Sequence, residues 1–216
     1  MITIGILGAF ALNNWNENRI NRNAQREILS SIKSGLEDAF FKVETIKNDE
    51  EQFFYKLRDF LRQPALTDAN PSKVFYDVAW AGDEASISIE SYVEIQDFDK
   101  LPEKNSMIIR GISTIENRIR NIKVNNQDRL VVQQQRIDPY LVSSLSLPSL
   151  LNATDSTLQL YELGEFNLSE TLNNPEFRNA IALKMSLTMH IVDQYTSLQE
   201  SIREVITIID NELNQE

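Results

Sequence analysis

The chain has 216 residues, contains no cysteine and carries a formal net charge of −11 at pH 7. This length suits one domain with a single core, and the missing thiols exclude disulfides, thiolate metal sites and cysteine nucleophiles. The acidic balance disfavours a nucleic-acid partner, because affinity for phosphate backbones rests largely on lysine and arginine.

The chain opens with an apolar run, residues 1–12, which as a helix would cover only ~18 Å of the ~30 Å of bilayer hydrocarbon. The run is apolar on all sides and ends at a polar cluster with one tryptophan, a pattern typical of a membrane–water boundary. The predicted boundary residues are Asn13, Asn14, Trp15, Asn16 and Glu17. We therefore expect the C-terminal half of a membrane helix over residues 1–14. A short signal peptide ending near Ala9-Phe10-Ala11 and a buried first turn of a bundle are the alternatives.

Two helices are predicted next. Residues 14–62 carry apolar side chains every three or four positions, with polar residues between them, and Gln63-Pro64 predicts where that helix ends. Gly35 is the one position in it where a bend is expected. Asn70-Pro71 then predicts the start of a short helix that reaches Gly82 and turns Phe75 and Trp80 inward, since asparagine caps free amides and proline fits the first helical position.

Residues 83–100 are predicted to be helical, because a lone pair of strands would have no partner. Another long helix is expected to open at Pro102, with isoleucines spaced by alternating fours and threes at Ile108, Ile112, Ile115, Ile119 and Ile122. Its apolar seam weakens after Val124 and resumes at Leu130, Val131 or Val132, and Ile137, before a turn or kink at Asp138-Pro139.

This third region is also the only basic one, with six basic and three acidic residues between positions 105 and 140. We expect these charges to face acidic neighbours within the bundle. The alternative is a patch for an anionic ligand or lipid headgroup. The six residues are Arg110, Arg118, Arg120, Lys123, Arg129 and Arg136.

Residues 141–172 are predicted to form short helical pieces and loops, and Asn174-Pro175-Glu176 begins a last helix that runs almost to the terminus. With three long helices, several short ones and no convincing strand, the sequence predicts an all-α, elongated helical bundle. Residues 15–216 are expected to form this bundle as a single domain.

The segments Ile4-Gly5-Ile6-Leu7 and Asn13 to Glu17 resemble the junction in a family of short single-pass membrane proteins of unknown function, common in Bacteroidota. REILSSIKSGLED and NNPEFRNAIALK also resemble that family's helical domain, more diffusely. Family members carry a basic segment and a full membrane helix at the N-terminus, parts of which this chain lacks. The resemblance implies a cytoplasmic N-terminus and a periplasmic helical domain by the positive-inside rule, whereas Arg19, Arg22 and Arg26 favour the opposite orientation.

The sequence predicts no enzyme and no cofactor. His190 is the only histidine, and a metal site there would need Asp193 or Gln194 together with Glu94 or Asp97, so we expect a packed or surface residue instead. Carboxylates at Asp83-Glu84 and Asp97-Asp99 fall in acidic, loop-like stretches that are usually solvated. Nucleophile-elbow and phosphate-binding glycine motifs are absent from the sequence.

The sequence thus predicts a non-enzymatic, membrane-attached module for protein interaction or scaffolding at the cell envelope. It would contact membrane lipid through its N-terminal segment and bind a protein partner or a second copy. One alternative is an extracytoplasmic, sensor-like bundle with a small ligand among Trp80, Tyr92, Arg118 and Tyr161. The other is a soluble oligomer that uses residues 1–12 as its contact.

Overall fold

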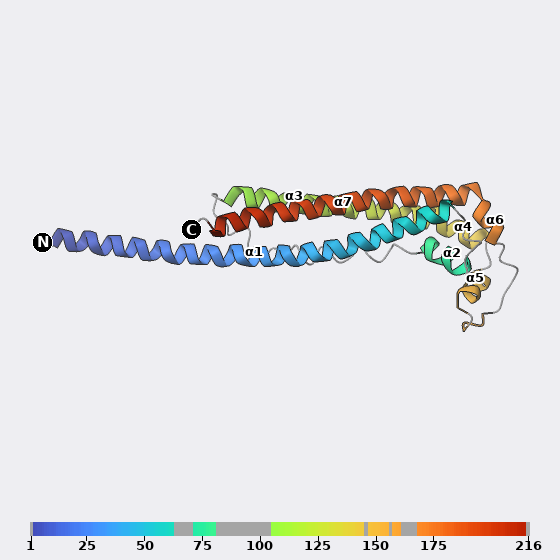
Figure 1. The fold of residues 1–216 in the computed structure, drawn as a ribbon, viewed down its shortest axis with the longest axis horizontal. Coiled ribbons are helices and arrows are strands. Elements are labelled where there is room, and N and C mark those ends of the chain that lie inside the picture. The colour runs from blue at the N-terminus through green and yellow to red at the C-terminus, as the bar shows by residue number, and fades with distance from the viewer. Residues whose placement is uncertain are drawn as a thin grey trace.

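The computed structural model describes residues 2–62, 71–80, 105–144, 147–155, 157–160 and 168–214. Every regular element in these ranges is helical. The order is α1 (Ile2–Arg62), α2 (Pro71–Trp80), α3 (Ser106–Val132), a π-helical turn η3 (Gln133–Ile137), α4 (Asp138–Ser144), α5 (Leu147–Thr154), α6 (Leu168–Asn173) and α7 (Pro175–Asn214). The predicted all-α, elongated bundle of three long helices with several short ones is confirmed (Figure 1).

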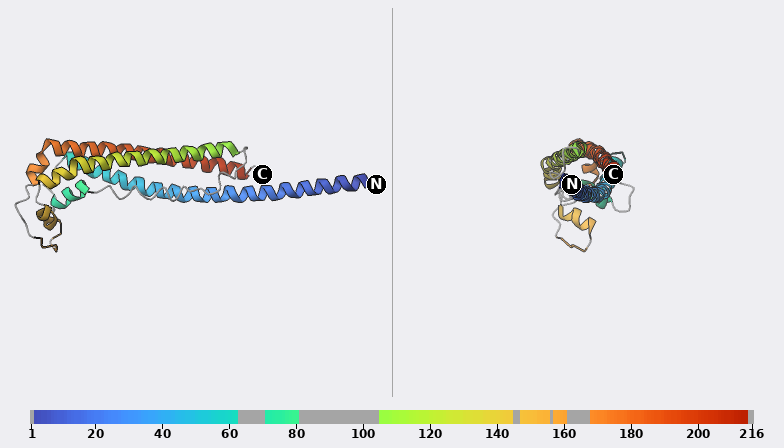
Figure 2. Two further views of the ribbon diagram at one scale, coloured as in Figure 1. Left: turned by 180° about the vertical axis from the view of Figure 1, so that it is seen from behind. Right: turned by 90° about the vertical axis from the view of Figure 1, so that its left-hand side faces the viewer.

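The long helices lie along one axis, and α7 runs antiparallel to both α1 and α3 (Figure 1). α1 and α3 pack mainly against α7 rather than against each other. The short helices α2, α4, α5 and α6 gather at one end, which we call the head, and α5 lies to one side of the bundle axis (Figure 2). At the opposite end α1 continues past the start of α3 and the end of α7, so the N-terminus projects alone.

The bundle forms because each long helix carries an apolar stripe at spacings of three and four. Leu29, Ile32 and Leu36 begin the stripe of α1, and all three are almost fully buried. They pack with the predicted isoleucines of α3 and with the apolar face of α7 in one core cluster, the proximal core. Its buried residues are Leu29, Ile32, Leu36, Ala39, Val43, Ile108, Ile112, Ile115, Ile122, Ile191, Tyr195, Leu198, Ile202, Val205 and Ile209.

The head has its own core, the distal core, built around Phe177 of α7. The Phe177 ring stacks on Phe75 at a centroid distance of 5.4 Å and on Tyr140 at 5.1 Å, and it meets Phe60 edge-on at 6.4 Å. Phe75 is buried, as predicted, and Trp80 is half-buried at the edge of this cluster. Aromatic packing therefore joins the end of α1 to α2, α4 and α7.

Several predicted boundaries agree with the structure and others differ. α1 ends at Arg62, just before the predicted Gln63-Pro64 stop, and it stays helical through Gly35. It also passes the predicted division between residues 14 and 15 without a break. α3 begins at Ser106, whereas its predicted start at Pro102 and the predicted helix over residues 83–100 lie outside the described residues.

The predicted break at Asp138-Pro139 is wrong, because the chain remains helical there. The π-helical turn over Gln133–Ile137 absorbs the irregularity, and Pro139 falls in the first turn of α4, where no intrahelical donor is required. The apolar seam does resume at Val132 and Ile137, but Leu130 is only half-buried. Arg129 occupies the buried position instead.

Two helical glycines give a matched test of packing. A methyl group at Gly111 would collide with Cγ2 of Val205, a β-branched side chain with little rotamer freedom, whereas one at Gly35 would meet nothing within 4 Å. We expect Gly35→Ala to raise the free energy of unfolding by about 1 kcal/mol through helix propensity. Gly111→Ala should lower it by up to ~2 kcal/mol, because overpacking outweighs the same propensity gain. Urea denaturation measures both, and Val205→Ala should relieve the Gly111→Ala defect; equal stabilisation by the two alanines would contradict close α3–α7 contact.

Candidate functional site

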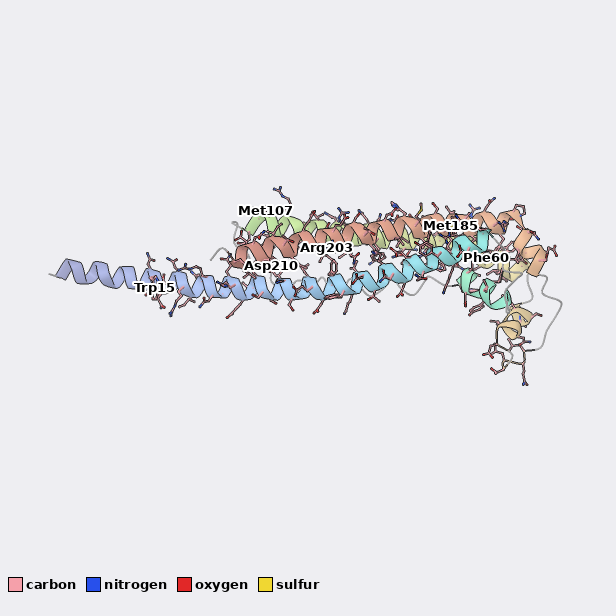
Figure 3. The ribbon with its side chains drawn as sticks, in the orientation of Figure 1. Trp15, Phe60, Met107, Met185, Arg203 and Asp210 are labelled. Atoms are coloured by element: carbon pink, nitrogen blue, oxygen red, sulfur yellow. The ribbon has the colours of Figure 1, made fainter. Side chains whose placement is uncertain are left out.

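The predicted membrane-boundary residues lie on the projecting part of α1. All five, positions 13–17, are exposed, and in Figure 3 Trp15 lies well beyond Met107 and Asp210, which mark the near end of the bundle. Asn13 donates to Glu17 at 2.9 Å, and the Arg19 guanidinium lies 5.2 Å from the centre of the Trp15 ring. Within the described residues, no helix combines the length and apolarity needed to cross a membrane.

The other candidate residues do not converge. His190 is exposed and lies 3.2 Å from the Gln194 amide, and the described part of the chain holds no cluster of three metal-ligating side chains. The acidic candidates Asp83, Glu84, Glu94, Asp97 and Asp99 and the ligand candidates Tyr92 and Tyr161 lie outside the described residues.

The two remaining ligand candidates are far apart. Trp80 borders the distal core, whereas Arg118 lies on α3 beside the proximal core, 15 residues before Gln133. At 1.5 Å per residue this separation is ~22 Å along the helix. The predicted small-ligand site therefore does not assemble from this pair.

A cluster that the sequence analysis missed separates the two cores. We call it the polar layer, and its members come from α1, α3, η3 and α7, each with at most 2% of its surface exposed. They are Glu50, Arg129, Gln133, Lys184 and Thr188. Residues this inaccessible do not suit a substrate-binding surface, but they do suit the fixing of one helix arrangement.

The centre of the polar layer is a two-pronged ion pair between α1 and α3. Arg129 donates from Nη2 to Oε1 of Glu50 at 2.9 Å and from Nη1 to Oε2 at 2.5 Å. Nη1 also lies 3.4 Å from the Thr188 hydroxyl, and Nη2 donates to the Asn126 side chain at 3.2 Å. A buried charge pair is tolerated only with such geometry and with partners for its remaining donors.

Lys184 extends the polar layer to the head. Its ammonium donates to Oε1 of Gln133 at 2.7 Å and to the Ala79 carbonyl at 3.2 Å, and it lies 5.2 Å from the Phe53 ring centre. The Ala79 carbonyl is among the last four of α2, which lack partners within the helix. Lys184 therefore caps α2 from α7 with a cation at the negative end of the helix dipole.

Arg178 does the same for two other helices. It donates to the Leu61 carbonyl, at the end of α1, at 2.7 Å and to the Leu172 carbonyl, at the end of α6, at 3.2 Å. Asn174 caps α7 itself by accepting from the Phe177 amide at 3.0 Å. The segment NNPEFRNAIALK thus holds three helix ends together through two cations.

The polar layer has a sequence signal. Glu50 follows Val43 by seven positions, Arg129 follows Ile122 by seven, and Lys184 follows Ile181 by three, so each continues a buried apolar stripe. Polar residues in register with such a stripe indicate a buried network. The basic stretch over residues 105–140 therefore contains one member, Arg129, that differs from exposed neighbours such as Arg110 and Arg120.

Tyr195, one turn beyond the polar layer on α7, is fully buried in the proximal core. Burial raises the pKa of its hydroxyl to about 12, and the nearby Glu50 charge adds to the shift, partly offset by Asn126 and Arg129.

Comparisons with protein-family models, curated proteins and solved structures found no match to this chain.

Removing one half of the ion pair should be costly. We expect Glu50→Ala to lower the free energy of unfolding by ~3–5 kcal/mol, because it leaves the Arg129 charge buried without its carboxylate. Glu50→Leu combined with Arg129→Met should cost less than Glu50→Ala alone. The control is Glu51→Ala, whose half-buried carboxylate lies 3.8 Å from Lys47 and should change stability by no more than ~0.5 kcal/mol. Equal effects of Glu50→Ala and Glu51→Ala in urea denaturation would contradict the assignment.

The raised pKa of Tyr195 predicts a loss of stability at high pH. The unfolded chain releases this proton near pH 10 and the folded chain only near pH 12, so the contribution is complete below pH 10 and disappears toward pH 12. Denaturation across this window should show a loss of roughly 2–3 kcal/mol in the wild type that Tyr195→Phe lacks. Tyr55→Phe, at an exposed tyrosine, should follow the wild type, and parallel pH profiles for all three proteins would refute the shift.

Proposed function

We propose that the protein is a membrane-attached, non-enzymatic interaction module at the cell envelope, whose bundle holds a partner-binding head away from the bilayer. The observation that carries the proposal is the continuity of α1, which runs from Ile2 to Arg62 as one helix. Its residues 13–24 are all exposed, and Gln25 is the first residue of this region that contacts the bundle, donating to the Asn105 side chain at 2.9 Å. We call residues 13–24 the stalk.

The stalk fits a spacer. Its twelve residues would extend ~18 Å, and α1 as a whole ~90 Å, at 1.5 Å per residue. No glycine or proline occurs between Gly8 and Gly35. A helix without such residues lacks the usual causes of a sharp kink, which supports a stiff connection between the N-terminal segment and the head.

The head suits contact with a protein partner. Residues 138–176 contain six acidic and no basic side chains. Three large apolar side chains of this region, Val142, Leu158 and Leu160, are exposed. Asn152 bonds both the amide and the carbonyl of Leu160, at 2.8 and 2.7 Å, and so fixes the loop that presents two of them. An apolar contact rimmed by negative charge favours a partner with a basic surface.

The inaccessible polar layer supports a non-enzymatic role, since its ionisable groups are too buried to meet a substrate. The family resemblance implies a periplasmic head, which we include in the proposal. Membrane attachment also distinguishes it from the soluble-oligomer alternative.

The test is fractionation of the protein tagged at its C-terminus and expressed from its own chromosomal position. We expect the tag to stay with carbonate-washed membranes and to become protease-sensitive in spheroplasts, with a cytoplasmic protein as the control for intact cells. Release by carbonate would refute attachment. A tag protected in intact spheroplasts would refute the periplasmic orientation but leave attachment in place.

A further inference from the structure

Three residues of the stalk form one stripe on α1, which we call the Trp–Arg stripe: Trp15, Arg19 and Arg22. They are spaced by four and three positions and therefore share one face of the helix. All are exposed, Trp15 to 56%, and the Arg19 guanidinium stacks on the Trp15 ring. Arg26 continues the same face but donates to the Leu213 carbonyl at 3.3 Å and so belongs to the bundle end.

We infer that the Trp–Arg stripe binds the anionic headgroups of a lipid bilayer. This inference rests on the proposed membrane attachment and names the lipid chemistry that the stalk selects. Tryptophan prefers the headgroup level of a membrane, and arginine forms two-pronged hydrogen bonds with phosphate.

The arginines keep donors available for such a contact. Arg19 donates to the Asn16 side chain and Arg22 to the Asn18 carbonyl, each at 3.3 Å and each within the same helix. Glu17 is the only acidic residue among the first 26, and Asn13 already donates to it. No other described element covers this face, since the stalk lies outside the bundle (Figure 3).

The distribution of charge favours the lipid surface over other anions. Residues 1–26 carry three arginines and one glutamate, a net +2, whereas residues 27–216 carry 18 basic and 31 acidic residues, a net −13. An anionic bilayer would attract the stalk and repel the rest of the molecule. This asymmetry holds the rod away from the membrane with the stalk toward it.

Distance along the helix limits the stripe to its first two arginines. With Trp15 at the headgroups, Arg19 lies ~6 Å and Arg22 ~10 Å further along the axis, at about the ~8 Å Debye length of physiological salt. Arg26 would be ~17 Å away and largely screened. Each arginine near the surface should strengthen binding about fivefold, and the pair roughly twentyfold.

The test is cosedimentation of the 216-residue protein with vesicles of phosphatidylcholine alone and of phosphatidylcholine and phosphatidylglycerol in equal parts. We expect the anionic vesicles to bind more tightly, and Arg19→Gln with Arg22→Gln to lower this preference roughly twentyfold while binding to neutral vesicles is unchanged. The matched control is Arg110→Gln with Arg120→Gln, two exposed arginines of α3 with the same change in charge, which should retain the preference.

Different failures have different meanings. If the wild type binds both vesicles equally and the stripe variant behaves alike, the headgroup inference is wrong and attachment stands. If the wild type binds neither vesicle, attachment through this segment is wrong as well. Displacement from anionic vesicles by soluble glycerol phosphate would replace the lipid surface with a site for a free phosphate.

Discussion

The ion pair between Glu50 and Arg129 sets the relative positions of the long helices. α1 and α3 both pack on α7, and regular apolar stripes alone would permit a shift by one heptad with similar burial. Such a shift would leave two charges buried in apolar surroundings without partners, at a cost of several kcal/mol. The polar layer therefore selects one register, and the proximal and distal cores form on either side of it.

The same register positions the head through α7. Lys184 and Arg178 lie six positions apart and reach the carbonyl ends of α1, α2 and α6. Helix ends need partners for their last carbonyls, and a buried cation supplies them with favourable charge. The head is thus joined to the bundle by directional contacts to backbone groups as well as by the rings around Phe177.

Periodicity and capping residues were sufficient to predict the helices of the bundle. Gln63-Pro64 marked the end of α1, and Asn174 caps α7 as its sequence position indicated. The polar layer was not predicted, because a period-based reading assigns Glu50 and Arg129 to the surface and cannot pair residues 79 positions apart. The π-helical turn was missed for a related reason: Asp138-Pro139 predicts a break by local rules, but Gln133 and Ile137 are held by tertiary burial.

The continuity of α1 makes the polar layer relevant to the stalk. Glu50 lies 35 residues beyond Trp15 on the same helix, or ~52 Å at 1.5 Å per residue. A helix transmits axial displacement along its length, whereas side chains absorb it only where they can repack. Because the layer forbids small shifts of α1 against α3, force on the head reaches the stalk as movement of the whole bundle. An attached rod of this kind suits holding a partner at a set distance from a membrane better than signalling by sliding helices.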